Sequence, residues 1–289
     1  YAGDPGSTKY SPLDQIDATN FEELQIAWRW QSADGALDLD ALREQRPRVS
    51  IRGLQATPLM VGGVLYFNTP LSQGVAVDAT TGETRWVFNP KSYEEGTTTM
   101  TGTWRQRGVA YWTDGQDERI FWGTSEGYLL SVDAKTGQPA IDFGNNGRVD
   151  LTEGIPRATR GDTNYQGRNL LGVKSPPVVL RDVVVAPTII SDFVVRKEAP
   201  PGWLKGIDAR TGDTRWIFRT VPQADDFGAD TWLNESWRYS GNVNVWPPMS
   251  ADAETGQVGP EIAELMGIPH VGQVCKLEWP QRAGSMVEQ

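Results

Sequence analysis

Short runs of apolar and β-branched residues, bounded by glycines or charged pairs, recur along the chain and predict strands rather than helices. Residues 59–67 (LMVGGVLYF) and 177–185 (PVVLRDVVV) each place a Gly-Gly or Arg-Asp pair between two apolar runs, which is the pattern of a β-hairpin. Helical spacing of apolar residues is nearly absent before residue 258. Further strands are expected at residues 74–78, 119–123 and 127–133. The pattern predicts an all-β protein.

A five-residue pattern, Asp-Ala-x-Thr-Gly, occurs four times and organises the chain. Its spacing is 55, 75 and 44 residues, and the copies begin at Asp78, Asp133, Asp208 and Asp252. The pattern is typical of a tight turn, because Asp accepts hydrogen bonds from the backbone ahead of it and Gly adopts a positive φ. Two copies continue into strands with a tryptophan four residues past the glycine. We expect these residues, Trp86 and Trp216, to pack on the neighbouring repeat.

A hairpin, a strand, the turn and a tryptophan strand together make a four-stranded blade, and repeated blades form a β-propeller. At roughly 40–45 residues per blade, and allowing for the long interval between the second and third turns, we expect about four or five blades and an incomplete ring. The 12 tryptophans fit a repeated packing role, since such large side chains are otherwise rare. The alternative is a β-sandwich in which the turn pattern recurs by coincidence.

Composition and charge exclude several classes of function. With 27 basic and 37 acidic side chains the net charge is −10, which argues against nucleic acid as a partner, because phosphates require clustered Lys and Arg. No run approaches the ~18 apolar residues of a membrane-spanning helix. The single cysteine, Cys275, excludes a disulfide framework and a Cys-rich zinc site. The single histidine, His270, argues against a His-ligated metal cluster and a Ser-His-Asp triad. The first residues carry no leader-like stretch, so we expect either a cytoplasmic protein or a removed secretion signal.

The repeated turn followed by tryptophan resembles the tryptophan-docking motif of the quinoprotein dehydrogenases, which are eight-bladed β-propellers that use pyrroloquinoline quinone. Residues 143–147 (FGNNG) favour the glucose-dehydrogenase-like branch of that family. The resemblance implies oxidation of an alcohol or aldose in the periplasm, with pyrroloquinoline quinone and Ca²⁺ as cofactors and a quinone or cytochrome as electron acceptor. It is also carried by residues 1–16, 24–28, 56–60, 65–67, 107–111, 175–177 and 241–246.

The resemblance further implies a set of site residues. Trp246 matches the tryptophan that stacks on the quinone, Arg107 an arginine that contacts the cofactor, and Asp192 a carboxylate ligand of Ca²⁺. Ser175 and Gln55 are additional candidates for cofactor contacts. The residue types suit this chemistry, because guanidinium groups pair with carboxylates and Ca²⁺ prefers oxygen ligands. The ordinary alternatives are a blade-docking tryptophan, a surface ion pair and a solvated loop carboxylate.

The sequence also departs from the family pattern. Gln55 stands where the family often carries a glutamate, and an amide cannot act as a base. Residues 104–107 (WRQR) replace the family's histidine or vicinal cysteine pair, and no Cys-x-x-Cys-His motif for covalent haem occurs. The family's aspartate base has no counterpart, so the catalytic residue stays unknown. We do not expect strong activity from this polypeptide alone.

The repeated β-strand pattern of the sequence ends after residue 256. Residues 1–256 are assigned to propeller blades and residues 257–289 to a tail outside the family pattern. In that tail a helix is expected after Pro260 and a strand over residues 271–277. The tail resembles a short piece of the β subunit of electron-transfer flavoproteins. Two origins stay open: a truncated or spliced reading frame, and a natural short relative.

An incomplete ring exposes strand edges, which predicts homo-oligomers formed through those edges. The leading hypothesis for function is a quinoprotein-type dehydrogenase acting on a small alcohol or sugar. The alternative is a non-catalytic β-propeller that serves as a protein-binding scaffold. A third option, a flavin-linked electron carrier, rests only on the tail.

Overall fold

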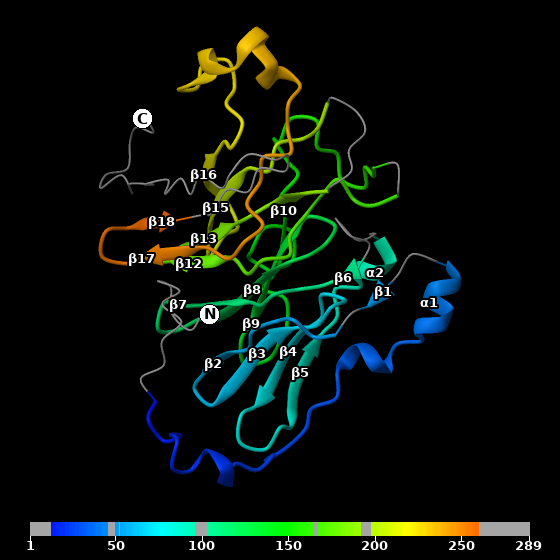
Figure 1. The fold of residues 1–289 in the computed structure, drawn as a ribbon, viewed down its shortest axis with the longest axis vertical. Coiled ribbons are helices and arrows are strands. Elements are labelled where there is room, and N and C mark those ends of the chain that lie inside the picture. Colours follow the sequence, from blue (N-terminus) through cyan, green and yellow to red (C-terminus); the bar gives the residue numbers. More distant parts are fainter. Residues whose placement is uncertain are drawn as a thin grey trace.

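Three four-stranded antiparallel sheets and the hairpin of a further pair of strands follow one another along the chain (Figure 1). The computed structural model describes residues 13–45, 50–51, 53–95, 103–164, 167–191 and 198–259. The first sheet contains β2 (Leu59–Val61), β3 (Val64–Asn68), β4 (Gly74–Asp78) and β5 (Thr84–Phe88). The second contains β7 (Ala110–Thr113), β8 (Glu118–Gly123), β9 (Tyr128–Asp133) and β10 (Arg148–Asp150). The third contains β12 (Val178–Leu180), β13 (Val183–Ala186), β15 (Leu204–Asp208) and β16 (Thr214–Phe218). The hairpin contains β17 (Ser250–Asp252) and β18 (Gln257–Gly259).

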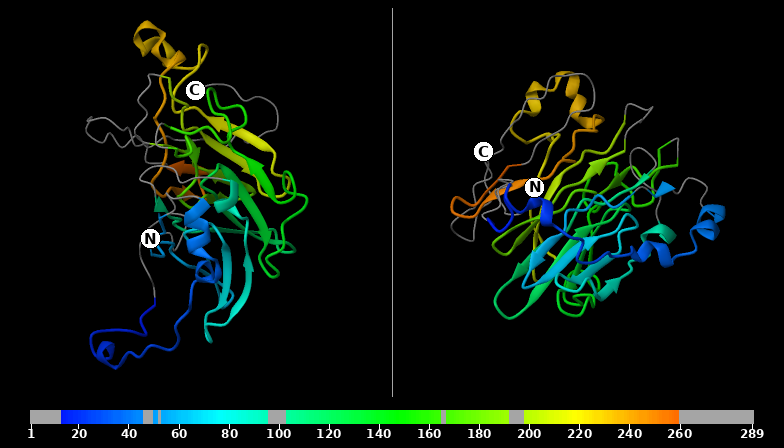
Figure 2. Two further views of the ribbon diagram at one scale, coloured as in Figure 1. Left: turned by 90° about the vertical axis from the view of Figure 1, so that its right-hand side faces the viewer. Right: turned by 60° about the horizontal axis from the view of Figure 1, so that its bottom comes forward.

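Short elements connect these sheets. The parallel pair is β1 (Ser50–Ile51) with β6 (Thr103–Trp104), and an antiparallel pair joins β11 (Leu171–Gly172) to β14 (Ile189–Ile190). The helices are α1 (Leu39–Gln45) and α2 (Ser92–Glu95), with 3₁₀ turns η1 (Phe21–Glu23), η2 (Ala33–Ala36), η3 (Ala229–Thr231) and η4 (Leu233–Arg238). The turns η3 and η4 belong to a long excursion between β16 and β17 that stands at one end of the molecule (Figure 2).

All four Asp-Ala-x-Thr-Gly copies form the turn that the sequence predicts. In the first, the Asp78 carboxylate accepts hydrogen bonds from the amides of Thr80 and Thr81 at 2.9 and 3.0 Å, and Gly82 has φ 77°. The amide of Gly82 also donates to the Asp78 carbonyl at 2.9 Å. The same carboxylate contacts recur at Asp133, Asp208 and Asp252. The local sequence alone therefore specifies these turns.

Large apolar side chains fill the spaces between successive sheets. Trp122, Tyr66 and Val132 lie in the cluster between the first and second sheets. A second cluster, with Phe121 and Phe143, joins the second sheet to the third, and a third cluster joins that sheet to the β17–β18 hairpin. Such burial of apolar surface is the main favourable term in folding, at roughly 25 cal/mol per Å². The sheets therefore pack face to face in chain order, as propeller blades do.

Tryptophans fasten one repeat to the next through its turn. The Trp28 ring lies over Gly82 and its indole N–H donates to the Ala79 carbonyl at 3.1 Å. The Trp86 ring lies over Gly137 in the same way and its N–H donates to the Ala134 carbonyl at 2.9 Å. The expected packing of Trp86 on the neighbouring repeat is confirmed.

The joint between the second and third sheets is built differently. Ile141 occupies the position of the docking tryptophan and is 77% exposed. In place of an indole, the backbone of Gly144 lies against Gly212, and the Gly144 amide donates to the Thr211 carbonyl at 2.8 Å. Buried Phe143 anchors this loop in the apolar cluster. Residues 143–147 (FGNNG) therefore connect the second sheet to the third in place of a docking tryptophan.

The all-β expectation is confirmed, and no closed ring forms among the described residues. Those residues contain three complete blades and the β17–β18 hairpin, and the excursion between β16 and β17 uses about thirty residues without a strand. Strand β18 begins at Gln257, just past the expected domain boundary. The tail helix and strand, with His270 and Cys275, lie outside the described residues, so the division into residues 1–256 and 257–289 stays a prediction. No helix in the described part of the chain is long and apolar enough to cross a bilayer.

Candidate functional site

The candidate site is built from four entry segments, defined as the residues that directly precede the first strand of each of the three blades and of the β17–β18 hairpin: 53–58, 105–109, 173–177 and 243–249. Backbone hydrogen bonds join the first three side by side. The Thr57 amide donates to the Arg107 carbonyl at 3.0 Å, and the Arg107 amide donates to the Lys174 carbonyl at 3.0 Å. Segments far apart in sequence therefore meet at one place, because each blade begins there.

Arg107, Ser175 and Trp246 contact one another at this meeting point. The Arg107 guanidinium donates to the Trp246 carbonyl at 2.9 Å and lies 3.4 Å from the Ser175 hydroxyl oxygen. Its carbon Cζ lies 4.9 Å from the centroid of the Trp246 ring, a cation–π contact. The buried Ser175 hydroxyl also donates to the Trp246 carbonyl. Three of the five sequence-predicted site residues are thus brought together from three different blades.

The other two predicted residues are placed differently. The Gln55 side chain is exposed and lies two residues before Thr57 in the first entry segment, so it shares the region but not the contact. Asp192 lies outside the described residues, directly after buried Ser191. No group of three or more His, Cys, Asp or Glu side chains able to hold a metal occurs within the described ranges. The predicted Ca²⁺ ligand therefore stays a prediction.

Sequence reasoning missed one polar residue of the site. Lys174 is buried next to Ser175, in an otherwise apolar run from Leu170 to Val173. A lysine is rarely buried without partners, because the charged form loses its hydration. A lysine that ends an apolar run and precedes Ser-Pro-Pro is the signal that could have identified it.

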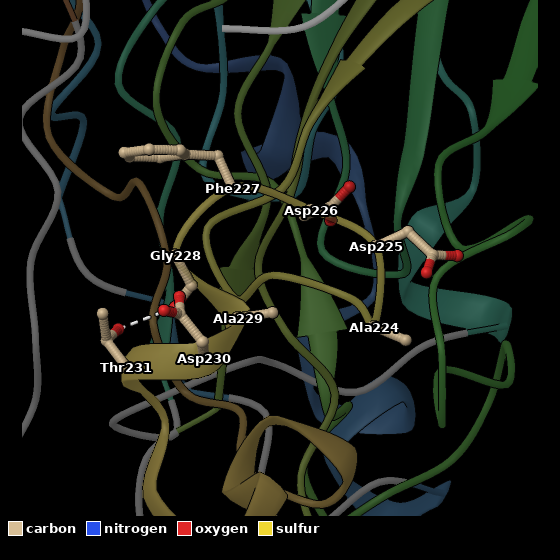
Figure 3. A pocket seen from close by; sticks show the side chains of 8 residues that line it. All are labelled: Ala224, Asp225, Asp226, Phe227, Gly228, Ala229, Asp230 and Thr231. Atoms are coloured by element: carbon tan, nitrogen blue, oxygen red, sulfur yellow. Dashed lines mark hydrogen bonds between the residues drawn. The ribbon is translucent and has the colours of Figure 1, made fainter.

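Two other polar features lie outside this site. Residues 224–231 line an open depression in the excursion, with Phe227 95% exposed at its rim (Figure 3). The depression is formed by one contiguous loop and lacks a basic side chain, so it offers no converging chemistry. Its residues contribute nothing to the entry segments.

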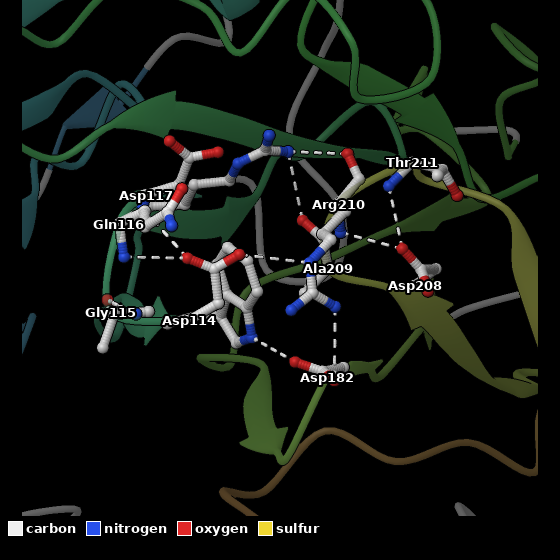
Figure 4. A network of polar contacts seen from close by, with 12 residues as sticks. Asp114, Gly115, Gln116, Asp117, Asp182, Asp208, Ala209, Arg210 and Thr211 are labelled. Carbon is white, nitrogen blue, oxygen red and sulfur yellow. Dashed lines mark hydrogen bonds and ion pairs between the residues drawn. The ribbon is translucent and has the colours of Figure 1, made fainter.

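A charged network lies between the second and third blades (Figure 4). Arg210 pairs with Asp114 at 3.2 Å and with Asp182 at 3.2 Å, and its side chain lies over the Trp112 ring. The hydrogen bond from Arg210 to Asp182 raises the pKa of Arg210, and backbone amides of Asp117 and Gln116 lower the pKa of Asp114. The Arg210–Asp114 pair crosses the joint and the Arg210–Asp182 pair lies within the third blade, so the network helps to hold the two blades together.

The site offers an aromatic surface and a cation, the two features that bind a flat anionic ligand. The half-buried Trp246 indole supplies an aromatic surface, and Arg107 supplies a cation whose Cζ lies over that ring. Successive four-stranded blades with such a site beside their first strands define a β-propeller protein with one aromatic and cationic site.

The family model for the β-propeller domain of PQQ-dependent glucose/ethanol/alcohol dehydrogenases matches residues 1–258. The chain therefore belongs to this family, and the expected pair of cofactors, pyrroloquinoline quinone and Ca²⁺, is the one typical of it.

Individual relatives agree with the family assignment. Quinoprotein glucose dehydrogenase A of Acinetobacter calcoaceticus is 29% identical over 273 residues, which is 88% of this chain and 31% of that protein. Quinohemoprotein alcohol dehydrogenase ADH IIB of Pseudomonas putida is also 29% identical, over 85% of this chain and 31% of its own length. The chain thus spans about a third of the length of the curated relatives it matches.

Solved structures show the same fold. The quinohemoprotein alcohol dehydrogenase ADHIIG of Pseudomonas putida superposes with a TM-score of 0.66 at 26% identity, covering 89% of this chain and 33% of that one. A europium-containing methanol dehydrogenase superposes with a TM-score of 0.60 at 20% identity, covering 89% and 41% of the two chains. At that identity the second likeness speaks for the fold alone.

Proposed function

We propose that this chain forms the cofactor-binding part of a quinoprotein dehydrogenase that oxidises an alcohol or aldose. The contact among Arg107, Ser175 and Trp246 carries the proposal, because a flat tricarboxylated quinone needs both an aromatic surface and a cation. When bound beside Ca²⁺, pyrroloquinoline quinone supplies the electrophilic carbonyl that accepts hydride from the substrate carbinol.

Each residue has a separate role in this proposal. Trp246 stacks on the cofactor ring and excludes water from that face. Arg107 binds cofactor oxygens, and Ser175 fixes the backbone that carries Trp246. Gln55 donates a hydrogen bond from its exposed amide, and Asp192 is the carboxylate ligand of Ca²⁺. No residue of the chain is assigned as the catalytic base.

The wider context of the reaction follows the family. We propose a small alcohol or sugar as substrate, a quinone or cytochrome as electron acceptor, and a periplasmic location, with the Trp28 and Trp86 contacts acting as tryptophan-docking joints. The resemblance of the sequence to the glucose-dehydrogenase-like branch supports the sugar among these substrates.

The test is a titration of the chain with pyrroloquinoline quinone, with and without Ca²⁺, followed by tryptophan fluorescence. Saturable quenching that needs Ca²⁺ and is lost in Trp246→Ala supports the proposal. Trp237→Ala is the matched control, because Trp237 lies in the excursion and packs against Arg238. Asp192→Asn should remove the Ca²⁺ requirement together with most of the affinity. Equal quenching in Trp246→Ala and the parent chain refutes the assigned site.

A non-catalytic, protein-binding scaffold is the second candidate. It is favoured by the exposed apolar side chains of the segment before the first blade, which include Phe21 and Ile26. Absence of any saturable quinone binding by the parent chain would leave this candidate in place of the first.

A further inference from the structure

The chain that carries Trp246 is zipped to a second segment upstream of it. Residues 199–202 run alongside residues 239–243, and three backbone hydrogen bonds join them. The Ala199 amide donates to the Tyr239 carbonyl at 3.2 Å, the Asn242 amide to the Pro200 carbonyl at 3.2 Å, and the Gly202 amide to the Val243 carbonyl at 2.9 Å. We call this pair of segments the zip. It lies outside the named strands, so sheet formation alone does not account for it.

The zip is also tightly packed. A Cβ atom on Gly241 would collide with the Ala199 and Pro200 carbonyl oxygens, and one on Gly202 would collide with Asn244. The two backbones therefore approach as closely as glycine permits. Any side chain at Gly241 must push the segments apart.

Arg157 clamps both halves of the zip from a third direction. Its Nε donates to the Ala199 carbonyl at 2.9 Å, its Nη1 to the Arg238 carbonyl at 2.7 Å, and its Nη2 to the Ser240 carbonyl at 2.8 Å. Each nitrogen of the guanidinium thus binds a different carbonyl. The rigid fork of arginine suits this arrangement, whereas the single ammonium of lysine cannot reproduce it.

The backbone at Arg157 shows that this placement is imposed by its surroundings. Arg157 has φ 61°, in the left-handed region that costs a non-glycine residue free energy. Burial also lowers the pKa of its guanidinium. Both costs are borne by a side chain whose three donors bind two carbonyls of the zip and the carbonyl of Arg238, the residue directly before it.

From the zip the chain reaches Trp246 within a few residues. The Val243 carbonyl accepts from the Gly202 amide and from the Thr220 hydroxyl at 2.9 Å, and the Val245 amide donates to the Thr188 carbonyl at 3.3 Å. The next residue is Trp246, whose carbonyl is held by Arg107 and Ser175. The backbone that carries the indole is therefore held by hydrogen bonds at two places. The zip holds the residues before Trp246, and Arg107 and Ser175 hold the Trp246 carbonyl.

We infer that Arg157 is a positioning residue of the cofactor site, which acts by locking the zip and thereby fixing the orientation of the Trp246 ring. The inference rests on the proposed function for its meaning, since a ring held in place matters when a flat ligand stacks on it. Arg157 itself contacts none of Arg107, Ser175 and Trp246 among its described hydrogen bonds.

The first experiment needs no cofactor. Acrylamide quenching of Trp246 is isolated as the difference between each chain and the same chain carrying Trp246→Phe. Arg157→Ala should raise the quenching constant of Trp246 by about twofold, because the loosened zip frees the ring. Gly241→Ala, which opens the zip without touching Arg157, should act in the same direction, and Arg157→Lys should fall between. Arg43→Ala removes an exposed arginine of α1 and should change nothing.

The second experiment measures affinity for pyrroloquinoline quinone in the same set of variants. Arg157→Ala should weaken binding by about tenfold, equal to about 1.4 kcal/mol. Arg157→Lys should recover part of that affinity, and Arg43→Ala should bind the quinone as tightly as the parent chain. Near-ultraviolet circular dichroism and the melting temperature identify any variant that fails to fold, in which case Arg157→Lys and Gly241→Ala decide.

The two experiments separate the two ideas. If the parent chain binds no quinone, the proposed function fails, while acrylamide quenching still judges the coupling of Arg157 to Trp246. If folded Arg157→Ala and Gly241→Ala both leave the quenching of Trp246 at the parent value, the positioning role is overturned, whatever the affinity.

Discussion

Single residues set the geometry of the repeated turn. In the first copy, Asp78 accepts two backbone hydrogen bonds and also pairs with Arg85 at 2.6 Å. These contacts favour the charged carboxylate. The hydrogen bond from Arg85, followed by those from the amides of Thr81 and Thr80, lowers the pKa of Asp78 from 3.8 to about 2.

This shift predicts how acid weakens the turn. A carboxyl whose folded pKa is depressed stabilises the fold fully above its unfolded pKa and loses that contribution as the pH falls through the folded value. The difference in unfolding free energy between the parent chain and Asp78→Asn should therefore be constant above about pH 4 and shrink between about pH 4 and 2. Urea denaturation across this pH range measures it. Asp225→Asn, at an exposed loop position, is the control for the removal of one carboxylate.

Gly137 shows a second constraint at the same scale. It has φ 71°, and a Cβ atom there would lie 2.6 Å from Cδ2 of Trp86. Gly137→Ala should therefore destabilise the chain by about 2–5 kcal/mol, since strain at positive φ and overpacking add.

Gly154 provides the matched control for that substitution. It has φ 73°, but no other atom lies within 4 Å of the place that a Cβ atom would take, so Gly154→Ala should cost only about 1–2 kcal/mol through backbone strain. Chemical denaturation of both variants gives the comparison. Equal losses would mean that contact with Trp86 contributes nothing to the cost.

Between elements, two kinds of joint hold the blades together. Trp28 and Trp86 dock by indole on the turn of the following repeat. The second repeat instead presents the loop at Phe143 and Gly144 to the third turn, and the charged network around Arg210 reinforces that joint. An indole and a glycine loop can therefore fill the same role, because both cover the turn and supply a hydrogen bond to it.

Because the loop at Gly144 already occupies the joint between the second and third blades, a tryptophan placed at position 141 should have little effect on stability. Ile141→Trp should change the unfolding free energy by no more than about 0.5 kcal/mol, because the Gly144 backbone already covers Gly212 and the new indole stays in solvent. Trp86→Ala should by contrast cost about 3–5 kcal/mol. Denaturation curves of both variants test this. A clear gain in stability from Ile141→Trp would show that the loop can be displaced.

On the scale of the whole molecule, the described blades do not close a ring, and apolar side chains remain exposed at one end of the series. They lie in the segment before the first blade: Leu13, Ile16, Phe21, Leu24 and Ile26. Exposed apolar side chains in one segment favour association, because covering them removes apolar area from water.

The 289-residue chain should accordingly self-associate in solution. Sedimentation velocity over a range of concentrations should show a rising mean mass, and the double variant Phe21→Glu with Ile26→Glu should shift the chain toward monomer. Phe227→Glu, at an aromatic on the excursion that is even more exposed than Phe21, is the control and should leave association unchanged. Association that responds only to Phe227→Glu would move the interface to the excursion.

Much of the fold could be predicted because its signals are local. The Gly62-Gly63 and Arg181-Asp182 hairpins and all four turns form where the sequence placed them. The excursion between β16 and β17, in which no strand forms, could not be predicted, because blade length was averaged along the chain. For the site, the family resemblance pointed to Arg107, Ser175 and Trp246, whereas the contacts of Arg157 carry no sequence pattern.

What the sequence by itself determined is the repeat, its turns and the family, since each depends on residues within a few positions of one another. Only the tertiary structure decided that Arg107, Ser175 and Trp246 touch, that Gly144 replaces a tryptophan, and that Arg157 closes the zip. Those contacts join residues up to 139 positions apart. Their geometry depends on how whole blades pack, because packing across sheets, rather than local propensity, brings such distant backbones together.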